Sequence, residues 1–149
     1  MLHASRFHAQ AERSLENAKK ILTVSYPFTN DPKLFTSVID RLYNSWINGL
    51  RALGVQNNTT AKSLNVKLGF SRGRFSQRHK VPQRILRTFD TIMKIKQARE
   101  ESPMEFRRKQ TFVICSPSLQ FQRLDKPTVQ SHVARTEEFL QIVRKGVPA

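Results

Sequence analysis

The residues with the clearest potential for chemistry form a run of cations between Arg72 and Arg99. Nine positions of this run are Lys or Arg, and Asp90 is its only acidic residue. Like charges at this density repel one another unless counter-charges are close, and one acid does not neutralise nine bases. The phosphates of a nucleic acid supply those charges and release condensed counterions on binding. Arginine outnumbers lysine six to three, and its planar guanidinium matches phosphate and stacks on bases, which favours RNA.

We therefore predict a site in which basic side chains bind RNA phosphates and neighbouring phenylalanines stack on exposed bases. The phosphate-binding candidates are Arg72, Arg74, Arg78, His79, Lys80, Arg84, Arg87 and Lys94, and the stacking candidates are Phe70 and Phe75. A solvated basic face without a specific partner is the plainer alternative. A membrane-surface role is disfavoured, because the helix predicted to carry many of these cations uses its apolar face for the core.

Two residues of this run also fit a catalytic pattern. The segment from Arg74 to His79, Arg-Phe-Ser-Gln-Arg-His, resembles the Arg-x4-6-His motif of HEPN ribonucleases. In those helical proteins, Arg and His assist the attack of a 2′-hydroxyl on the phosphodiester. A histidine with a pKa near 6.5 suits acid or base catalysis of that step. Such a spacing arises easily in an Arg-rich segment, and Phe75 stands where that family often has a polar residue. We expect a binding protein without enzymatic activity and keep the ribonuclease as the alternative.

Other catalytic and metal-binding patterns are missing from the sequence. It contains no Gly-rich phosphate loop, no Gly-x-Ser-x-Gly and no paired-carboxylate signature. Cys115 is the single cysteine and lies in an apolar run, which is typical of a buried, inert thiol. His3 and His8 are five positions apart, a spacing that does not place two ligands on one helix face. Glu100, Glu101 and Glu105 end or follow a predicted helix and are expected to be solvated partners of Arg107 and Arg108 instead of an active site. We expect neither a metal nor a cofactor.

The basic charge is confined to the middle of a chain with the length of one domain. The 149 residues carry a net charge of +15, and residues 51–99, with twelve bases and one acid, contribute +11 of it. The flanking thirds are nearly balanced and are predicted to be scaffold. No apolar run approaches the roughly 18 to 20 residues of a membrane span, and the N-terminus lacks the apolar core of a secretory signal. We expect a soluble, cytoplasmic protein with one domain, residues 1–149.

The hydrophobic pattern predicts four helices. The first covers residues 4–25 and ends at Tyr26-Pro27, because a residue before proline is disfavoured in the α conformation. The second begins at Asp31-Pro32, carries Trp46 on its apolar stripe and ends at Gly54. The third runs from about 82 to 101, and the last from about 126 to Gly146. The short loop between the first two predicts that they pack antiparallel.

The remaining segments are a predicted arm and a predicted hairpin. Residues 55–81 lack a helical pattern and are interpreted as a long basic arm between the second and third helices. Residues 111–115 and 119–124 are β-prone runs joined by Ser116-Pro117-Ser118, and they predict a hairpin that caps one end of the helical core. The predicted fold class is mainly α: a four-helix, up-down domain with a small hairpin before the last helix.

Two further stretches resemble a family of small uncharacterised archaeal proteins. One comprises residues 8–13, 23–27 and 31–34, and the other runs from Ser102 to Ser116. The resemblance implies a compact, mostly helical, cytosolic protein and no established function. From the residues alone we expect an RNA-binding component or associated factor of the ribosome or another ribonucleoprotein, with ribosomal RNA as partner. An adaptor for an acidic protein is a further alternative.

Overall fold

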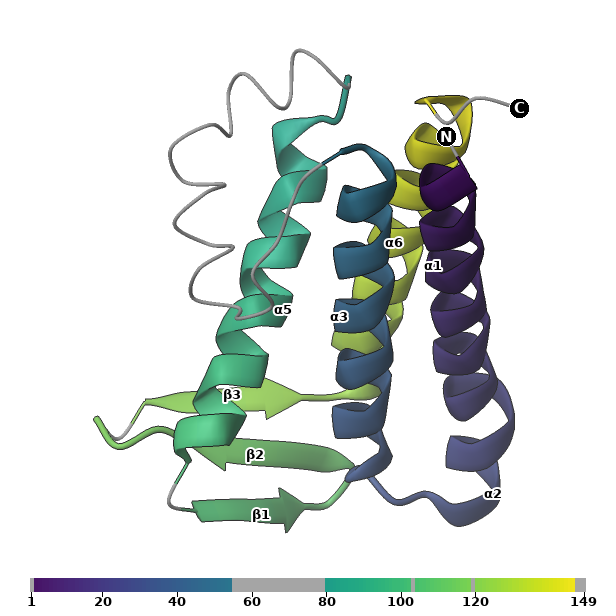
Figure 1. Cartoon of the computed structure of the whole chain (residues 1–149). Helices are drawn as coiled ribbons and strands as arrows, with labels where there is room; N and C mark the ends of the chain where they lie inside the picture. Colours follow the sequence, from purple (N-terminus) through teal and green to yellow (C-terminus); the bar gives the residue numbers. More distant parts are fainter. Residues whose placement is uncertain (1, 55–79, 103, 119, 147–149) are drawn as a thin grey trace.

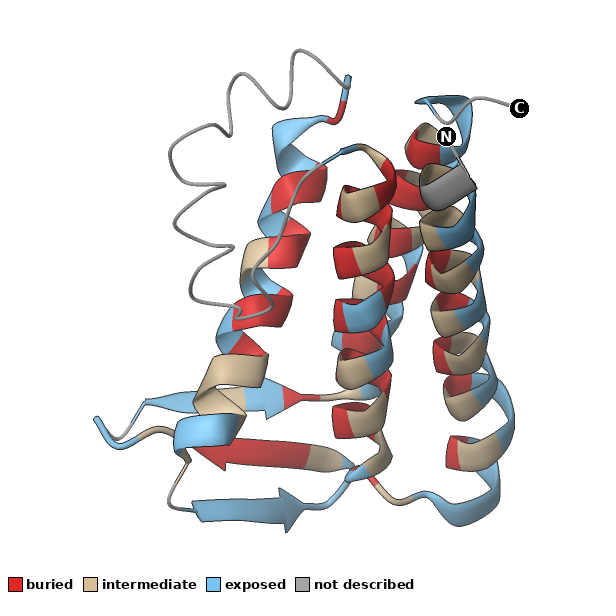
Figure 2. Ribbon diagram, in the orientation of Figure 1, coloured by how far each residue is buried: buried red, intermediate tan, exposed pale blue. Residues whose placement is uncertain are grey.

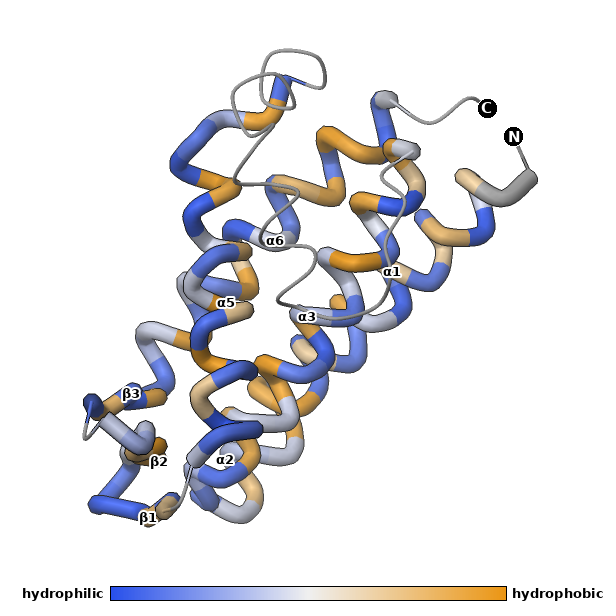
Figure 3. The backbone as a smooth tube through the Cα atoms, turned by 60° about the vertical axis from the view of Figure 1, so that its left-hand side comes forward, coloured by the Kyte–Doolittle hydropathy of each residue, from blue (hydrophilic) through white to orange (hydrophobic). Residues whose placement is uncertain are grey.

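Four long helices run alternately up and down, and a small antiparallel sheet lies at the end of the bundle remote from both chain termini (Figures 1 and 3). The computed structural model describes residues 2–54, 80–102, 104–118 and 120–146. The helices are α1 (Leu2–Lys20), α3 (Leu34–Ala52), α5 (Gln83–Glu101) and α6 (Lys126–Gly146), and the strands are β1 (Met104–Arg108), β2 (Thr111–Cys115) and β3 (Phe121–Leu124). The predicted fold class is confirmed. Apart from Lys80 and Val81, the predicted arm lies outside the described residues.

The four helices bury their apolar stripes against one another (Figure 2). On α1 the predicted core positions Ala11, Leu15 and Ala18 are buried. The hydroxyl of Ser45 on α3 donates a hydrogen bond to the carbonyl of Ala11 at 2.9 Å, which ties the two antiparallel helices together. α3 also approaches α6 closely at Gly49, where an added Cβ would lie 2.6 Å from a ring carbon of Phe139. The predicted antiparallel pair is therefore present and is covered by α6.

Trp46 lies at the centre of the bundle, where three helices meet. Its indole stacks between Phe89 of α5 and Phe139 of α6, with ring centroids 5.1 and 3.9 Å away. The indole Nε1 donates to the hydroxyl of Thr136 at 2.8 Å, and that hydroxyl donates to the carbonyl of His132 at 2.8 Å. The buried donor is thus satisfied, as buried polar groups in stable cores are. The prediction that Trp46 is a core residue is confirmed.

The predicted end of the first helix at Tyr26-Pro27 is wrong. The chain continues through a π-helical turn, η1 (Ile21–Ser25), into α2 (Tyr26–Thr29), and ends at Asn30 in a left-handed conformation with φ 52°. The wider π turn accommodates the ring of Pro27, which clashes with the preceding turn in a regular α-helix. Burial of Tyr26, whose ring centroid lies 4.7 Å from that of Phe35, offsets the cost of its α conformation.

The sequence signals at the two ends of α3 fare differently. Asp31 accepts a hydrogen bond from the backbone N–H of Lys33 through Oδ1 at 3.0 Å, and the helix begins at Leu34. After α3 the chain turns at Gly54, whose φ of 89° is disfavoured for other residues. The predicted end signal at Gly54 is confirmed. The start is displaced from the predicted position, since Lys33 is the N-cap residue and Pro32 lies in a turn before the helix, where the N–H of Leu34 donates to the carbonyl of Asp31 at 3.0 Å.

The sheet has three strands where two were predicted, in the order β1-β2-β3. The predicted hairpin is present as β2 and β3, with Cys115 opposite Phe121. The missed strand, β1, pairs antiparallel with β2, with Met104 opposite Cys115 and Arg108 opposite Thr111. All five residues of β1 are exposed, so it shows no buried alternation that a sequence pattern could reveal. The turn after β1 places Lys109 at φ 57°, a conformation usually signalled by glycine or asparagine.

Candidate nucleic-acid interface

Four of the ten residues predicted to bind RNA belong to the described part of the chain. They are Lys80, Arg84, Arg87 and Lys94, and all four are exposed. The other six, Phe70, Arg72, Arg74, Phe75, Arg78 and His79, lie outside the described residues. The stacking, phosphate-binding and catalytic hypotheses for those six stay predictions.

The helical members of the set share one face of α5. Arg84, Arg87 and Lys94 are exposed there, and the opposite side of the helix buries the predicted core residues Ile85 and Phe89. The spacing of three and seven positions brings the cations together at 3.6 residues per turn. We call Arg84, Arg87 and Lys94 the basic face of α5. Its predicted existence and orientation are confirmed.

The other two cations of α5 are not part of that face. Lys96 Nζ and Arg99 Nη1 each lie 3.2 Å from a carboxylate oxygen of Asp40 on α3. Lys96 Nζ also lies 4.8 Å from the ring centroid of Tyr43, within the range of a cation–π contact. Within the basic run Asp90 is the only acid, and the fold adds Asp40 of α3, which is 56 and 59 positions away from these two cations in the sequence.

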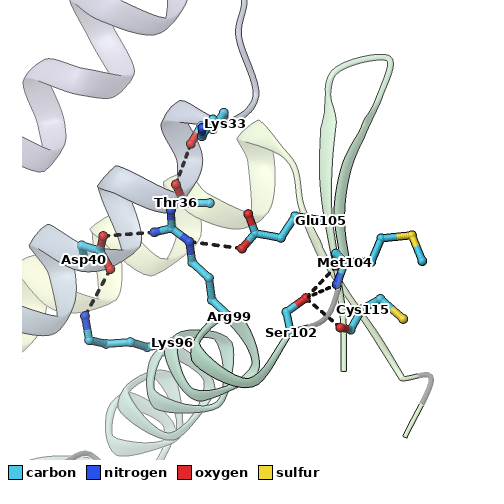
Figure 4. Close-up of polar contacts among 9 residues, drawn as sticks. All are labelled: Lys33, Thr36, Asp40, Lys96, Arg99, Ser102, Met104, Glu105 and Cys115. Atoms are coloured by element: carbon cyan, nitrogen blue, oxygen red, sulfur yellow. Dashed lines mark hydrogen bonds and ion pairs between the residues drawn. The ribbon is translucent and has the colours of Figure 1, made fainter. Parts of the chain in front are cut away.

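Arg99 also connects the bundle to the sheet (Figure 4). Its Nε lies 3.4 Å from a carboxylate oxygen of Glu105 on β1, while its Nη1 faces Asp40. The hydroxyl of Ser102 accepts the N–H of Met104 at 3.2 Å and lies within donor distance of the carbonyls of Met104 and Cys115. Glu105 thus pairs with a helix residue, and the expected pairing with Arg107 or Arg108 is wrong. These contacts position β1 beside β2 at the end of α5.

Ion pairing leaves the basic face of α5 largely uncompensated. Within the described ranges, Arg87 and Lys94 form no ion pair. Arg84 Nη1 lies 3.0 Å from a carboxylate oxygen of Glu138 on α6, but the arginine side chain is 57 % exposed. An exposed pair of this kind contributes little and is screened by salt. Lys96 and Arg99, which face α3, are thus paired with an acid in a partly buried setting. Arg84 has only an exposed ion pair, and Arg87 and Lys94 have none among the described residues.

A second surface, which the sequence pattern did not reveal, lies on the sheet. One side of the sheet joins the helical core through Phe112, Ile114 and Leu124. Because strand side chains alternate, the other side presents Met104, Phe106, Arg108, Thr111, Val113, Cys115, Phe121 and Arg123, which we call the outer sheet face. Figure 4 shows Met104 and Cys115 pointing away from the helices, opposite to Glu105.

The outer sheet face combines aromatic rings with cations. Phe106 is 39 % exposed and Phe121 is 54 % exposed, and they lie on the two edge strands. An open hollow of about 490 Å³ is lined by Phe106, Val113 and Phe121 and by the cations Arg108, Lys109 and Arg123. These three cations form no ion pair among the described residues. Arg107, on the other side of β1, pairs with Asp31 at 3.2 Å.

Asp125, the acid that follows β3, is already engaged in hydrogen bonds. Asp125 follows β3 and caps α6, where its Oδ1 accepts the N–H of Thr128 at 3.0 Å. The hydrogen bonds from Thr128 hold the pKa of the Asp125 carboxyl below its ordinary value. The surface could have been found from the alternation of Met104, Phe106 and Arg108, if residues 104–108 had been assigned as a strand.

The basic face of α5 borders a hollow that reaches the edge of the sheet. Lys94 of the basic face lines an open depression of about 230 Å³ together with Gln97, Glu101, Ser118 and Gln122. Gln122 belongs to the edge strand β3, and Ser118 belongs to the connection between β2 and β3. A single extended ligand along α5 would therefore meet the edge of the sheet.

The remaining titratable candidates are parts of the scaffold. Cys115 is buried, as predicted, at 2 % exposure. His8 Nε2 lies 3.2 Å from a carboxylate oxygen of Glu12 one turn away. Burial lowers the pKa of His132, whose Nε2 has no hydrogen-bond partner in the described structure. Over the same ranges no three His, Cys, Asp or Glu side chains are grouped as metal ligands would be.

None of the helices within the described ranges combines the length and hydropathy needed to cross a lipid bilayer. No family model, curated protein or solved structure matches the chain. The resemblance to archaeal proteins stays a prediction.

Proposed function

We propose that this protein binds RNA without enzymatic activity, as a component or associated factor of the ribosome or another ribonucleoprotein. One observation carries the proposal: the fold pairs Lys96 and Arg99 with Asp40 but leaves Arg87 and Lys94 exposed and without an ion pair within the described structure. Because these two side chains are exposed and make no ion pair with the described residues, they are available to an external anion. Phosphates supply the missing counter-charges, and the sequence places Arg72, Arg74 and Arg78 close to the same helix in the chain.

The proposal requires that the position of the charge, and not only its total, determines RNA affinity. The test compares Arg87→Gln with Lys94→Gln, made together, against Arg13→Gln with Lys20→Gln on the exposed surface of α1. Both double variants remove two positive charges, so they have the same net charge. Binding of a fluorescein-labelled single-stranded RNA is followed by anisotropy between 50 and about 400 mM salt, concentrations over which phosphate contacts weaken strongly.

We expect the α5 pair to lower affinity about 20-fold at 0.1 M salt, because each lost single-strand phosphate contact removes about 0.7 from the slope of log K against log salt. The slope should become shallower by about 1.4 for the two contacts together. The α1 pair should change affinity less than about threefold. Equal losses in both pairs, or a wild-type slope near zero, would overturn the proposal.

A separate variant tests the part of the site that was predicted from sequence alone. Arg72→Ala, Arg74→Ala and Arg78→Ala, made together, should weaken RNA binding more than the α5 pair, because they remove three charges. Sequencing the RNA that co-purifies at low salt then tests the ribosomal assignment, for which we expect enrichment of ribosomal RNA.

The alternatives predict different results in the same preparations. A ribonuclease would cleave structured RNA, and His79→Ala would abolish cleavage while leaving affinity largely intact. An adaptor for an acidic protein would release its ligand to polyglutamate as readily as to RNA of equal charge. Either outcome would replace the proposed function.

A further inference from the structure

The outer sheet face carries the second inference, which rests on the proposed function and names the kind of RNA it involves. We infer that this face binds unpaired nucleotides, with Phe106 and Phe121 stacking on bases and Arg108, Lys109 and Arg123 contacting the phosphates between and beside them.

The two rings are placed to take separate bases. Phe106 stands opposite Val113, and Phe121 stands opposite Cys115, two residues further along β2. Strand spacing and rise put their Cα atoms about 12 Å apart, one on each edge of the sheet. The hollow between them is open and lined by Val113. Bases stacked on the two rings would therefore lie side by side over the sheet instead of on each other.

The charges around the rings distinguish a polyanion from an apolar partner. Arg123 lies on the same cross-strand row as Phe106 and Val113, and Arg108 lies on the next row, opposite Thr111. Lys109 extends the cationic border into the turn. The paired acid of β1, Glu105, points to the other side, toward Arg99 (Figure 4). An apolar protein surface would leave these three cations desolvated without counter-charges, whereas a nucleotide chain brings a phosphate with every base.

The exposed rings also favour single strands over duplexes. In a duplex each base face is covered by the next base pair, so it is inaccessible to a protein ring. Unpaired bases offer that face, and stacking on an aromatic side chain is tolerant of sequence. The basic face of α5 lacks exposed aromatic rings in the described residues, and its cations contact phosphate in either kind of RNA. Substitutions on the outer sheet face should therefore lower affinity for single-stranded RNA only. Substitutions on the basic face of α5 should lower affinity for single-stranded and double-stranded RNA alike.

The experiment uses the full chain and two labelled RNAs, a 12-nucleotide oligouridylate and a 12-base-pair duplex. Phe106→Leu with Phe121→Leu keeps an apolar side chain at both positions but removes the ring, and Phe106→Tyr with Phe121→Tyr keeps the ring. Phe28→Leu is the matched control, because Phe28 on α2 is 90 % exposed and lies outside the outer sheet face. The thermal melting of each variant checks that the fold is retained.

We expect the leucine pair to lower affinity for the oligouridylate 10-fold or more, since stacking on each base contributes appreciably. Its affinity for the duplex should change less than twofold. The tyrosine pair and Phe28→Leu should stay within about threefold of the wild type on both ligands. Photocrosslinking of a 4-thiouridine oligonucleotide should label the peptide that contains Phe106 or Phe121.

Three results would contradict the inference, and each points to a different role for the outer sheet face. If the α5 pair weakens binding and the leucine pair does not, the proposed function stands and the stacking role of the sheet is wrong. If leucine substitutes fully for phenylalanine while Phe106→Ser with Phe121→Ser abolishes self-association in sedimentation, the face is an apolar contact between copies of the chain. Binding to anionic phospholipid vesicles without binding to either RNA overturns both proposals.

Discussion

Phenylalanine rings occupy two contrasting regions of this molecule. Phe89 and Phe139 are fully buried and stack on Trp46, where three helices meet. Phe106 and Phe121 lie partly exposed on the outer sheet face, at the end of the bundle. Apolar area removed from water stabilises a fold in proportion to its size, so the first pair stabilises the bundle and the second contributes little. The comparison separates rings that the fold requires from rings that are available to a ligand.

The polar and charged groups beside the buried rings and beside the exposed rings also differ in whether they have partners. In the bundle, the indole N–H of Trp46 is satisfied by Thr136, which in turn is bonded to the carbonyl of His132. On the sheet, Arg108 and Arg123 flank the rings and form no ion pair with the described residues. The polar group beside the buried rings is therefore satisfied within the fold, whereas the cations beside the exposed rings are left without a counter-charge there. Three predictions test this contrast.

The largest expected effect is on stability. Phe139→Ala should lower the free energy of unfolding by about 3–5 kcal/mol, because it removes a buried ring and leaves a cavity beside Trp46. Phe106→Ala should lower it by less than about 1 kcal/mol, because that ring is partly exposed and lies outside the core cluster. Urea unfolding followed by the fluorescence of Trp46, the only tryptophan, measures both. Similar losses in the two variants would remove the distinction between the regions.

A smaller effect concerns the thiol under the exposed rings. Cys115 stands between Met104 and Phe121 in the sheet register and is buried although it is not part of the core cluster. Phe121→Ala should uncover it and raise its rate of modification by a thiol reagent about 10-fold or more, because access limits the reaction of a buried thiol. The control Phe28→Ala should leave the rate unchanged. Since Cys115 is the only cysteine, the reaction reports on this site alone.

The smallest effect is on the pH dependence of stability. Burial lowers the pKa of His132 below its ordinary value of 6.5. The unfolded chain therefore takes up the proton first, so the free energy of unfolding falls as the pH decreases below about 6.5 and is unaffected by this group above it. For one proton the slope stays below about 1.4 kcal/mol per pH unit. Comparing wild type with His132→Gln between pH 7.5 and 5 isolates the contribution, and identical slopes would contradict it.

Much of the fold was predictable because local patterns carry it. Helical periodicity located the four long helices, and Gly54 marked the end of α3 as a stop residue does. The prediction was wrong where packing overrides a local preference. Pro27 does not end the first helical segment, because a π turn makes room for it and burial of Tyr26 stabilises the continuation.

The candidate site was predictable only in part. The exposed positions of Arg84, Arg87 and Lys94 followed from the helical wheel of α5. The outer sheet face did not, because β1 is exposed along its whole length and acquires its conformation from pairing with β2. Buried and exposed residues do not alternate along such a strand, so it is recognised from its pairing with β2 and not from its sequence.

Residue type and spacing along the chain were enough to predict the helical class, the core stripes and the concentration of +11 charges in residues 51–99. Which cations are neutralised depends instead on the packing of the helices, because Asp40 meets Lys96 and Arg99 across segments that are far apart in sequence. The tertiary structure also decided that Phe106 and Phe121 share one face, because strand pairing sets which side chains stand next to one another.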